Sequence, residues 1–438
     1  MKLLRLALFS AAVVSPLAIA AQDIPVAPAP PPKDAAPPSG TSNPAVQSLM
    51  QSDGIGRADA EERIGLQADI LALLESTALT SDPGFVELVV VHKPVYQVIL
   101  SFADNSDKAE LLKSVPAKLR RYVKVRKAKH DRGQRAGSLS ALSKAVGGTG
   151  KSLPIGYDSI AERYFVEVPD EAARSQVTAV VPPGIAADVD VLITEIPTKE
   201  QSQSTTATPA GVRAGDWAAA GYRSTSTAAS TNPGAPCTLA YPVTFGTNLR
   251  GILTAGHCTE PKYIHYADHD VTFTSAYIER DSGKYDFAIY RTDGLNTDYQ
   301  LYYWNRWGIP EFPASGWLRT KNFIRGANLW VGMSICVSGS VNGLACGKIV
   351  TLPYLWNGDP NAPYVLVSNT AQGDLNQPGD SGAATFAYVD PRTSVDISAT
   401  GIHVGGSGTG STAREVFMPI DRIFEVGVTN LKLITTPP

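Results

Sequence analysis

The composition of the chain changes abruptly between residues 198 and 236, where Ser, Thr, Ala and Gly dominate. Before this stretch, alternating and helical apolar patterns follow one another, which is typical of an α+β unit. After it, short apolar runs are separated by Gly, Pro, Asn and Asp, which is typical of an all-β fold. The chain has 438 residues, more than one domain usually contains. We therefore expect two folded units, joined by a linker and maturation region at 198–236 that proteases can reach.

The N-terminus has the pattern of a cleaved export signal, which we assign to residues 1–20. Lys2 and Arg5 precede an apolar run that closes on the small-residue pattern Ala18-Ile19-Ala20. Residues 21–57 begin with many Pro and Ala residues and are predicted to be an extended linker. No later segment has the roughly 18 uninterrupted apolar residues that a membrane crossing needs. We expect a soluble, secreted protein, extracellular or periplasmic, without membrane contact once the signal is removed.

Residues 58–197 are predicted to form the α+β unit. Apolar residues recur at helical spacing from Ala58 to Ser76. A strand, helix and strand then follow twice, at 96–102, 107–115 and 122–128, and again at 163–168, 170–180 and 188–196. No catalytic pattern is visible here. A basic stretch is expected to be a solvated face or a set of processing sites, although it could bind anions or contact an acidic domain: Arg120, Arg121, Lys124, Arg126, Lys127, Lys129, Arg132 and Arg135.

Residues 237–438 are predicted to form the all-β unit, with one helix near residues 419–424. They hold all of the cysteines, Cys237, Cys258, Cys336 and Cys346, and an even number in an exported chain favours disulfides. Three pairings are possible, and closeness along the chain favours Cys237 with Cys258 and Cys336 with Cys346. No Cys-x-x-Cys occurs, so we expect no metal.

Three short motifs in the second unit fit together chemically. His257 ends the string Leu253-Thr254-Ala255-Gly256-His257, Asp286 begins an apolar run, and Ser381 lies in Gly379-Asp380-Ser381-Gly382. A serine hydroxyl becomes a nucleophile when an imidazole removes its proton and a buried carboxylate orients that imidazole. The order His, Asp, Ser distinguishes this solution from those of the subtilisins and the α/β-hydrolases. We therefore predict that His257, Asp286 and Ser381 are catalytic.

The glycines around the serine also have a chemical reason. An acyl oxyanion must approach backbone N–H groups closely, so we assign the oxyanion hole to the amides of Gly379 and Ser381.

Two alternatives remain between the first two motifs. Asp268, Asp270 and Asp281 could replace Asp286, but only Asp286 begins a run that can bury a carboxylate. His265, Asp268, His269 and Asp270 could be a metal cluster, although the segment is more typical of a polar strand end and turn.

From about Arg213 to Leu431 the sequence resembles the streptogrisin and α-lytic protease branch of the chymotrypsin family. The most specific motifs are Thr254-Ala255-Gly256-His257-Cys258 and Gly379-Asp380-Ser381-Gly382, and Cys336 to Gly347 resembles the second disulfide loop. The resemblance implies a pair of six-stranded antiparallel barrels that hydrolyse peptide bonds through an acyl-enzyme. We also expect a monomer and no cofactor. It also implies that residues 58–197 are a pro-region, which assists folding and inhibits the protease until it is removed.

The sequence departs from this family in places. Ala383 replaces the usual second glycine after the serine. Val337 stands where the family often places the Arg that pairs with the buried aspartate, which leaves the partner of Asp380 open.

The resemblance also predicts the residues that bind substrate. Leu375 and Asn376 fall near the floor of the primary specificity pocket, and Val404, Gly405 and Gly406 fall along its wall. The nearest acid, Asp374, is one position away from the floor, which argues against cleavage after Arg or Lys. His403 precedes the glycine pair, as in glutamyl-specific relatives, and predicts a preference for acidic residues before the cut. The alternative is a strand histidine that is hydrogen-bonded to its neighbours.

Charge excludes one class of partner, since the net charge is only −3 and charged residues make up 18% of the chain. We therefore expect protein or peptide substrates and no nucleic acid. The competing function is a catalytically silent binding or adhesion module, which would have no need for all three motifs.

Overall fold

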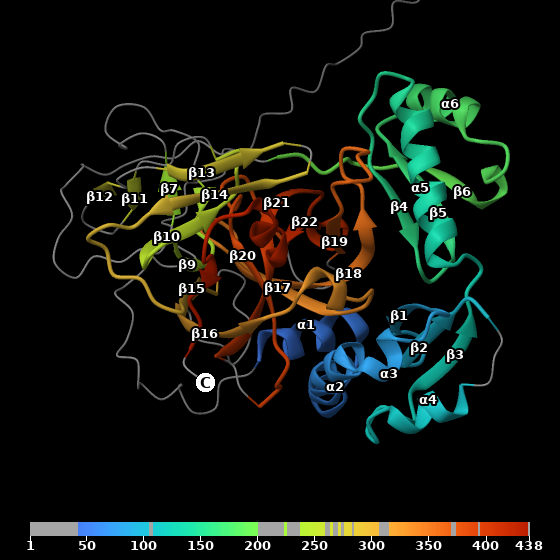
Figure 1. The fold of residues 1–438 in the computed structure, drawn as a ribbon, viewed down its shortest axis with the longest axis horizontal. Coiled ribbons are helices and arrows are strands. Elements are labelled where there is room, and N and C mark those ends of the chain that lie inside the picture. The colour runs from blue at the N-terminus through green and yellow to red at the C-terminus, as the bar shows by residue number, and fades with distance from the viewer. Residues whose placement is uncertain are drawn as a thin grey trace, which may run out of the picture.

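The computed structural model describes residues 43–104, 108–199, 223–225, 237–258, 263–265, 270–272, 276–282, 284–305, 315–368, 374–392 and 395–436. The predicted signal peptide lies outside these residues, as does most of the joining region 198–236. Within them, an N-terminal α+β unit lies beside an all-β body (Figure 1). None of the helices in the described part of the chain is both long and apolar enough to cross a membrane.

The N-terminal unit consists of two modules with the same sheet topology. The first contains α1 (Pro44–Asp53), α2 (Arg57–Glu75), α3 (Thr77–Thr80), β1 (Phe85–Val91), β2 (Gln97–Phe102), α4 (Ala109–Ser114) and β3 (Val123–Lys127). The second contains α5 (Arg132–Gly147), β4 (Ile155–Asp158), β5 (Arg163–Val168), α6 (Glu171–Val180), η1 (Ala186–Asp188) and β6 (Val189–Ile193). In each module the last two strands are parallel and the first strand pairs antiparallel with the middle one. The repeated strand, helix and strand pattern is therefore confirmed, and each copy carries an additional edge strand.

Helix α1 differs from the extended linker predicted for residues 21–57. The side chain of Asn43 accepts a hydrogen bond from the Ala45 amide (2.9 Å), and Pro44 occupies the first helical turn. Both are helix-start signals, because the first amides of a helix need an acceptor and proline is pre-shaped for that position. Ala45, Val46 and Leu49 are buried in a core shared with the all-β body. The Pro/Ala-rich segment therefore gives way to folded structure at Asn43.

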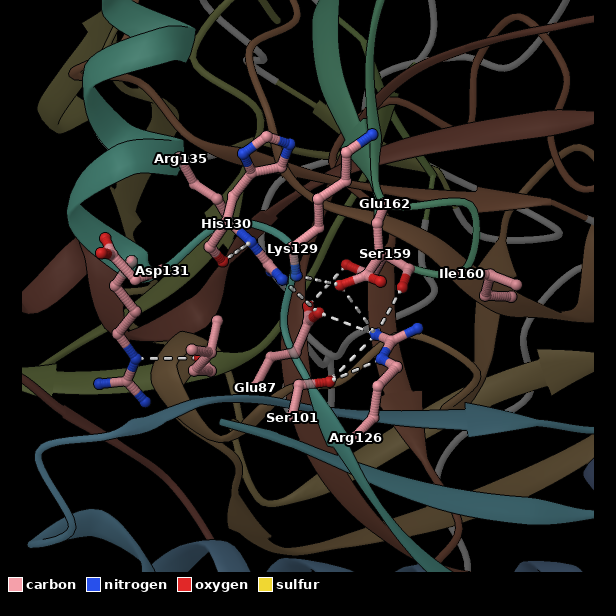
Figure 2. Close-up of polar contacts among 12 residues, drawn as sticks. Glu87, Ser101, Arg126, Lys129, His130, Asp131, Arg135, Ser159, Ile160 and Glu162 are labelled. Atoms are coloured by element: carbon pink, nitrogen blue, oxygen red, sulfur yellow. Dashed lines mark hydrogen bonds and ion pairs between the residues drawn. The ribbon is translucent and has the colours of Figure 1, made fainter. Parts of the chain in front are cut away.

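Most of the basic stretch is exposed, as predicted for a solvated face, but two of its residues, Arg126 and Arg135, form an internal network (Figure 2). Arg126 of β3 and Arg135 of α5 both contact the Glu87 carboxylate of β1, at 3.5 and 2.7 Å. Arg126 also donates to the Ser159 carbonyl (2.9 Å), and the Ser159 hydroxyl donates to Glu87 (2.6 Å). These contacts hold the two modules of the N-terminal unit together.

The C-terminal half of the all-β body is a closed barrel. Six strands follow one another around it with antiparallel pairing, and β21 pairs with β22 to close the ring. They are β17 (Ser334–Gly339), β18 (Gly343–Tyr354), β19 (Tyr364–Ser368), β20 (Ala384–Ala387), β21 (Asp396–Ser407) and β22 (Arg414–Pro419). This confirms one barrel of the predicted pair of six-stranded antiparallel barrels. β15 (Gln300–Trp304) and β16 (Ser315–Phe323) extend the same sheet.

The other half consists, in the described residues, of a five-stranded and a four-stranded sheet. The first orders β13 (Ala276–Asp281), β14 (Asp286–Arg291), β10 (Leu249–Thr254), β9 (Pro242–Phe245) and β23 (Lys432–Leu433). The second orders β12 (Asp270–Thr272), β11 (Tyr263–His265), β7 (Arg223–Thr225) and β8 (Cys237–Thr238). Three short 3-10 helices complete the body: η2 (Gly326–Asn328), η3 (Gly410–Thr412) and η4 (Ile420–Val426). The last of these stands where the sequence predicts an ordinary helix.

The N-terminal unit is attached to the barrel by backbone and side-chain contacts. Ile155 of β4 and Leu355, just after β18, exchange two backbone hydrogen bonds (3.1 and 2.8 Å). The buried Gln67 amide of α2 donates to the Tyr388 carbonyl and accepts from the Ser334 amide, both at 2.7 Å. A buried amide with both ends bonded to the barrel fixes the position of α2.

Candidate active site

Two neighbouring strands bring His257 and Asp286 together. β10 pairs antiparallel with β14, so the turn after β10 lies beside the first residue of β14. Oδ1 of Asp286 accepts a hydrogen bond from the His257 backbone amide, and Oδ2 lies 2.9 Å from its Nδ1. A side chain at Gly256 would lie 2.0 Å from the Arg280 carbonyl, so the close approach requires glycine.

The barrel supplies Ser381, which lies in the turn before β20. Its Oγ is 2.9 Å from His257 Nε2. Gly382 has φ +89°, and a β-carbon there would lie 2.1 Å from Thr254 Oγ1. The Gly382 amide donates to the His403 carbonyl of β21 (2.8 Å), which ties this turn to the strand. The structure thus links the side chains of Asp286, His257 and Ser381 in this order by hydrogen bonds, and we call these three side chains the hydrogen-bonded row.

Burial and charge act in opposite directions on the carboxylate of this row. Asp286 is fully buried, which by itself raises its pKa. The hydrogen bond from the His257 ring and the positive charges of His257 and Lys199 outweigh burial and lower the pKa of Asp286 below its usual value. The carboxylate therefore stays ionised and can stabilise a protonated imidazole.

The backbone around Ser381 is fixed by one residue of the opposite sheet. The Thr238 hydroxyl donates to the Gly379 carbonyl (2.9 Å), and the Thr238 amide donates to the Ser381 carbonyl (2.8 Å). Gly379 has φ +108°, which residues with a side chain rarely adopt. These contacts fix the peptide groups that carry the Asp380 and Gly382 amides, on either side of the Ser381 amide that we assigned to the oxyanion hole. The Ser381 amide shares its peptide plane with the Asp380 carbonyl, which accepts a hydrogen bond from the Ala383 amide (2.8 Å).

The partner of Asp380, left open by the sequence, is the backbone. Its carboxylate accepts hydrogen bonds from the amides of Val341 (2.8 Å), Asn342 (3.1 Å) and Gln377 (2.8 Å). Burial raises the pKa of Asp380, although these amides act to lower it. Backbone amides thus take the place of the Arg that is missing at Val337.

Of the residues predicted to bind substrate, Asn376 lies against Gly406 in the predicted wall of the specificity pocket. The Asn376 side-chain amide donates to the Arg414 carbonyl (2.9 Å), and a β-carbon on Gly406 would lie 2.1 Å from the Asn376 side-chain oxygen. Leu375 and Val404 are buried. His403 is fully buried, with Nδ1 3.4 Å from the equally buried Glu415.

The other predictions concern cysteines and metals. The structure contains the two favoured disulfides, Cys237–Cys258 and Cys336–Cys346. In the proposed metal segment, His265 ends β11 and Asp270 begins β12, whereas Asp268 and His269 lie outside the described residues. Among the residues that the structure describes, no group of three or more His, Cys, Asp or Glu side chains is arranged to hold a metal ion.

One element of the site had no signal in the sequence. The last described residues of the N-terminal unit, Glu195 to Lys199, lie against β21, and we call them the tail. Thr198 and Gly406 exchange two backbone hydrogen bonds (2.9 and 3.1 Å). Lys199 Nζ lies 3.1 Å from Oδ2 of Asp286. These partners are far apart in the sequence, and no local pattern marks them.

Comparisons with known proteins bear on this site. No family model matches the chain. Serine protease 2 of Streptomyces fradiae is 31% identical over 189 residues, which are 41% of this chain and 93% of that protein. Among solved structures, a Nocardiopsis protease (NAPase) is 18% identical, with a TM-score of 0.35, and the match covers 52% of this chain and 100% of the other. Thermobifida fusca Protease A is also 18% identical, with a TM-score of 0.34 and the same coverage.

The hydrogen-bonded row and the closed barrel, together with the relative from Streptomyces, define a serine endopeptidase. Within that class, the chain belongs to the chymotrypsin-like serine proteases of the streptogrisin type.

Proposed function

We propose that Ser381, His257 and Asp286 hydrolyse peptide bonds through an acyl-enzyme. The hydrogen-bonded row carries this proposal, because its distances of 2.9 Å at each end of the imidazole are those of proton transfer. Ser381 Oγ attacks the peptide carbonyl while His257 Nε2 takes the hydroxyl proton. His257 then gives this proton to the leaving amine as the carbon–nitrogen bond breaks. A water molecule, activated by the same imidazole, releases the acyl group.

In this proposal, the amides of Gly379 and Ser381 donate to the oxyanion of the tetrahedral intermediate. Removing one such donor typically costs about 3–4 kcal/mol of transition-state stabilisation. Two contacts support this role: the Ala383 amide donates to the Asp380 carbonyl, which shares a peptide plane with the Ser381 amide, and Thr238 holds the neighbouring peptide group through the Gly379 carbonyl.

The N-terminal unit acts, in the same proposal, as a pro-region that helps the exported chain fold and keeps it inactive. The tail supports inhibition, because Thr198 takes the backbone groups of Gly406 that a substrate strand would use. The pairing of Ile155 with Leu355 supports the folding role, since it supplies a template for the barrel strand β18.

We further propose that the enzyme prefers Glu or Asp before the cut. The residue that supports this preference is His403 of β21, whose Nδ1 lies 3.4 Å from the Glu415 carboxylate. A protonated imidazole attracts the carboxylate of a substrate side chain.

A fluorophosphonate probe tests the catalytic proposal. The secreted, processed protein is expected to be labelled on Ser381, and Ser381→Ala is expected to stay unlabelled. Absence of labelling in the parent protein, under conditions in which a control protease reacts, contradicts the proposal.

A peptide library with varied residues before the cut tests the preference. Cleavage mainly after bulky apolar residues, with little after Glu or Asp, would refute the acidic preference and leave the catalytic proposal intact.

A further inference from the structure

The tail is joined to β21 by one antiparallel bridge, between Thr198 and Gly406. Besides the two bonds between Thr198 and Gly406, the Pro197 carbonyl accepts a hydrogen bond from Trp356 Nε1 (2.7 Å). The Glu195 carbonyl accepts one from the Ser407 hydroxyl (3.2 Å). Contacts to the backbone from a strand edge fix the register of a peptide whatever its side chains are.

This register defines where a substrate chain would be attacked. In antiparallel pairing, each step toward the C-terminus of the bound chain is one step back along β21. A chain held like Thr198 therefore has its next two residues opposite Gly405 and Val404. Ser381 is adjacent to this point, because the Gly382 amide is bonded to the His403 carbonyl (2.8 Å). The attacked carbonyl thus belongs to the second residue after the one paired with Gly406, and Lys199 marks the residue immediately before it.

The surroundings of Lys199 are acidic. Its ammonium contacts the Asp281 carboxylate at the end of β13 and Oδ2 of Asp286. Burial lowers the pKa of Lys199, but the charge of Asp286 and the hydrogen bond to Asp281 outweigh it and raise this pKa. Asp286 already accepts hydrogen bonds from the backbone and ring of His257. Of the two carboxylates that contact Lys199, Asp281 is therefore the one that is not hydrogen-bonded to His257.

A cavity of about 400 Å³ beside the tail gives a long side chain room to reach this acid. From the all-β body, its lining includes Asp281, Ser282, Trp356 and Tyr364, and the tail completes it. Apolar walls suit the methylene stem of Lys or Arg, while the charged end meets the carboxylate.

We propose that Asp281 is a specificity-determining residue that selects Lys or Arg at the residue immediately before the one whose carbonyl Ser381 attacks. This inference rests on the proposed function and names a feature of its substrates. Lys199 is then the chain's own occupant of that subsite.

The test compares pairs of peptides that differ only at this residue, Lys against Gln, with the best residue from the library at the cut. The secreted, processed parent enzyme is expected to cleave the Lys peptide with a kcat/KM about tenfold higher. This is the lower end of what one hydrogen bond to a charged group contributes, because Asp281 is 44% exposed. Asp281→Asn should abolish this ratio, and Asp281→Lys should favour a peptide with Glu at the same residue.

Asp293→Asn is the matched control. Asp293 is similarly exposed (40% against 44% for Asp281) but follows the other end of β14, where it pairs with Arg291. It should keep the parent ratio. Equal kcat/KM for Lys and Gln in the parent enzyme, or an unchanged ratio in Asp281→Asn, overturns the proposal.

A measurement of peptide binding shows whether the subsite proposal or the catalytic proposal has failed. In Ser381→Ala protein that an added protease has cut within the joining region and that has been separated from its N-terminal unit, a labelled peptide with Lys should bind more tightly than its Gln counterpart in fluorescence anisotropy, and Asp281→Asn should remove the difference. No labelling and no hydrolysis, with this binding difference present, refutes the catalytic proposal alone. Labelling and hydrolysis without any Lys preference refutes the subsite alone.

Discussion

Replacing Asp53 by Asn is expected to loosen the N-terminal unit from the barrel. Asp53 ends α1, and its side chain is only 1% exposed. Its carboxylate lies 2.5 Å from Lys348 Nζ of β18, 3.2 Å from His92 Nδ1 and 3.4 Å from the Arg63 guanidinium. Burial favours the neutral acid, but hydrogen bonds from His92 and Lys348 hold the pKa of Asp53 well below its usual value.

The expected cost follows from the positive charges that remain. Removing one partner of a buried ion pair typically costs about 3–5 kcal/mol, because the other charge stays buried without compensation. The equilibrium population of the state in which α1 is open should therefore rise about a hundredfold to a few thousandfold. Hydrogen–deuterium exchange of the α1 amides measures this free energy, in a Ser381→Ala background that keeps the chain intact.

The destabilisation caused by Asp53→Asn should also depend on pH, in a direction that follows from the lowered pKa of Asp53. A carboxylate whose folded pKa is depressed contributes stability that is present above its unfolded pKa of 3.8 and is lost as the pH falls through the folded value. The difference between Asp53→Asn and its parent should therefore be full near neutral pH and shrink below pH 3.8. Asp69→Asn, at a half-buried position of α2, is the control. An Asp53 variant with exchange no faster than that of the Asp69 variant would refute the reasoning.

Three further predictions concern the catalytic centre and maturation. Asp286→Asn should lower kcat by about four orders of magnitude with little change in KM, because an amide holds the wrong imidazole tautomer; a reduction below tenfold would count against it. Gly382→Ala should abolish fluorophosphonate labelling, whereas Gly427→Ala, with a similar positive φ (+73° against +89°) but no atom within 4 Å of the added carbon, should keep it. The register of Thr198 predicts that the first cut follows Glu200, so N-terminal sequencing of processed protein should begin at Gln201; a start elsewhere rejects the register.

The sequence predicts those features whose determinants are local. The barrel strands follow from alternating apolar residues, and the His257, Asp286 and Ser381 motifs carry their chemistry within a few residues each. Asp286 is distinguished from Asp281 because only Asp286 begins a buried strand. The repeated strand, helix and strand pattern of the N-terminal unit is visible for the same reason.

Features that depend on contacts between segments distant in the sequence cannot be predicted from local patterns. The carboxylate of Asp380 is bonded to backbone amides of a turn about 40 residues earlier, and any sequence has backbone amides there. The tail meets Gly406 across 208 residues of chain, through main-chain groups alone. Helix α1 follows a Pro/Ala-rich segment and becomes stable only by burying Ala45, Val46 and Leu49 in the barrel core.

The three amides around Asp380 have a consequence for the proposed role of the N-terminal unit as a pro-region. They hold this carboxylate while the N-terminal unit is attached, so in that proposal the serine turn would need no later rearrangement to become competent. Latency would then depend on competition, since a tethered occupant has an effective local concentration in the millimolar range until its tether is cut. Cutting the tether would leave the unit held by its non-covalent contacts with the barrel alone, and free peptides would displace the tail as those contacts open.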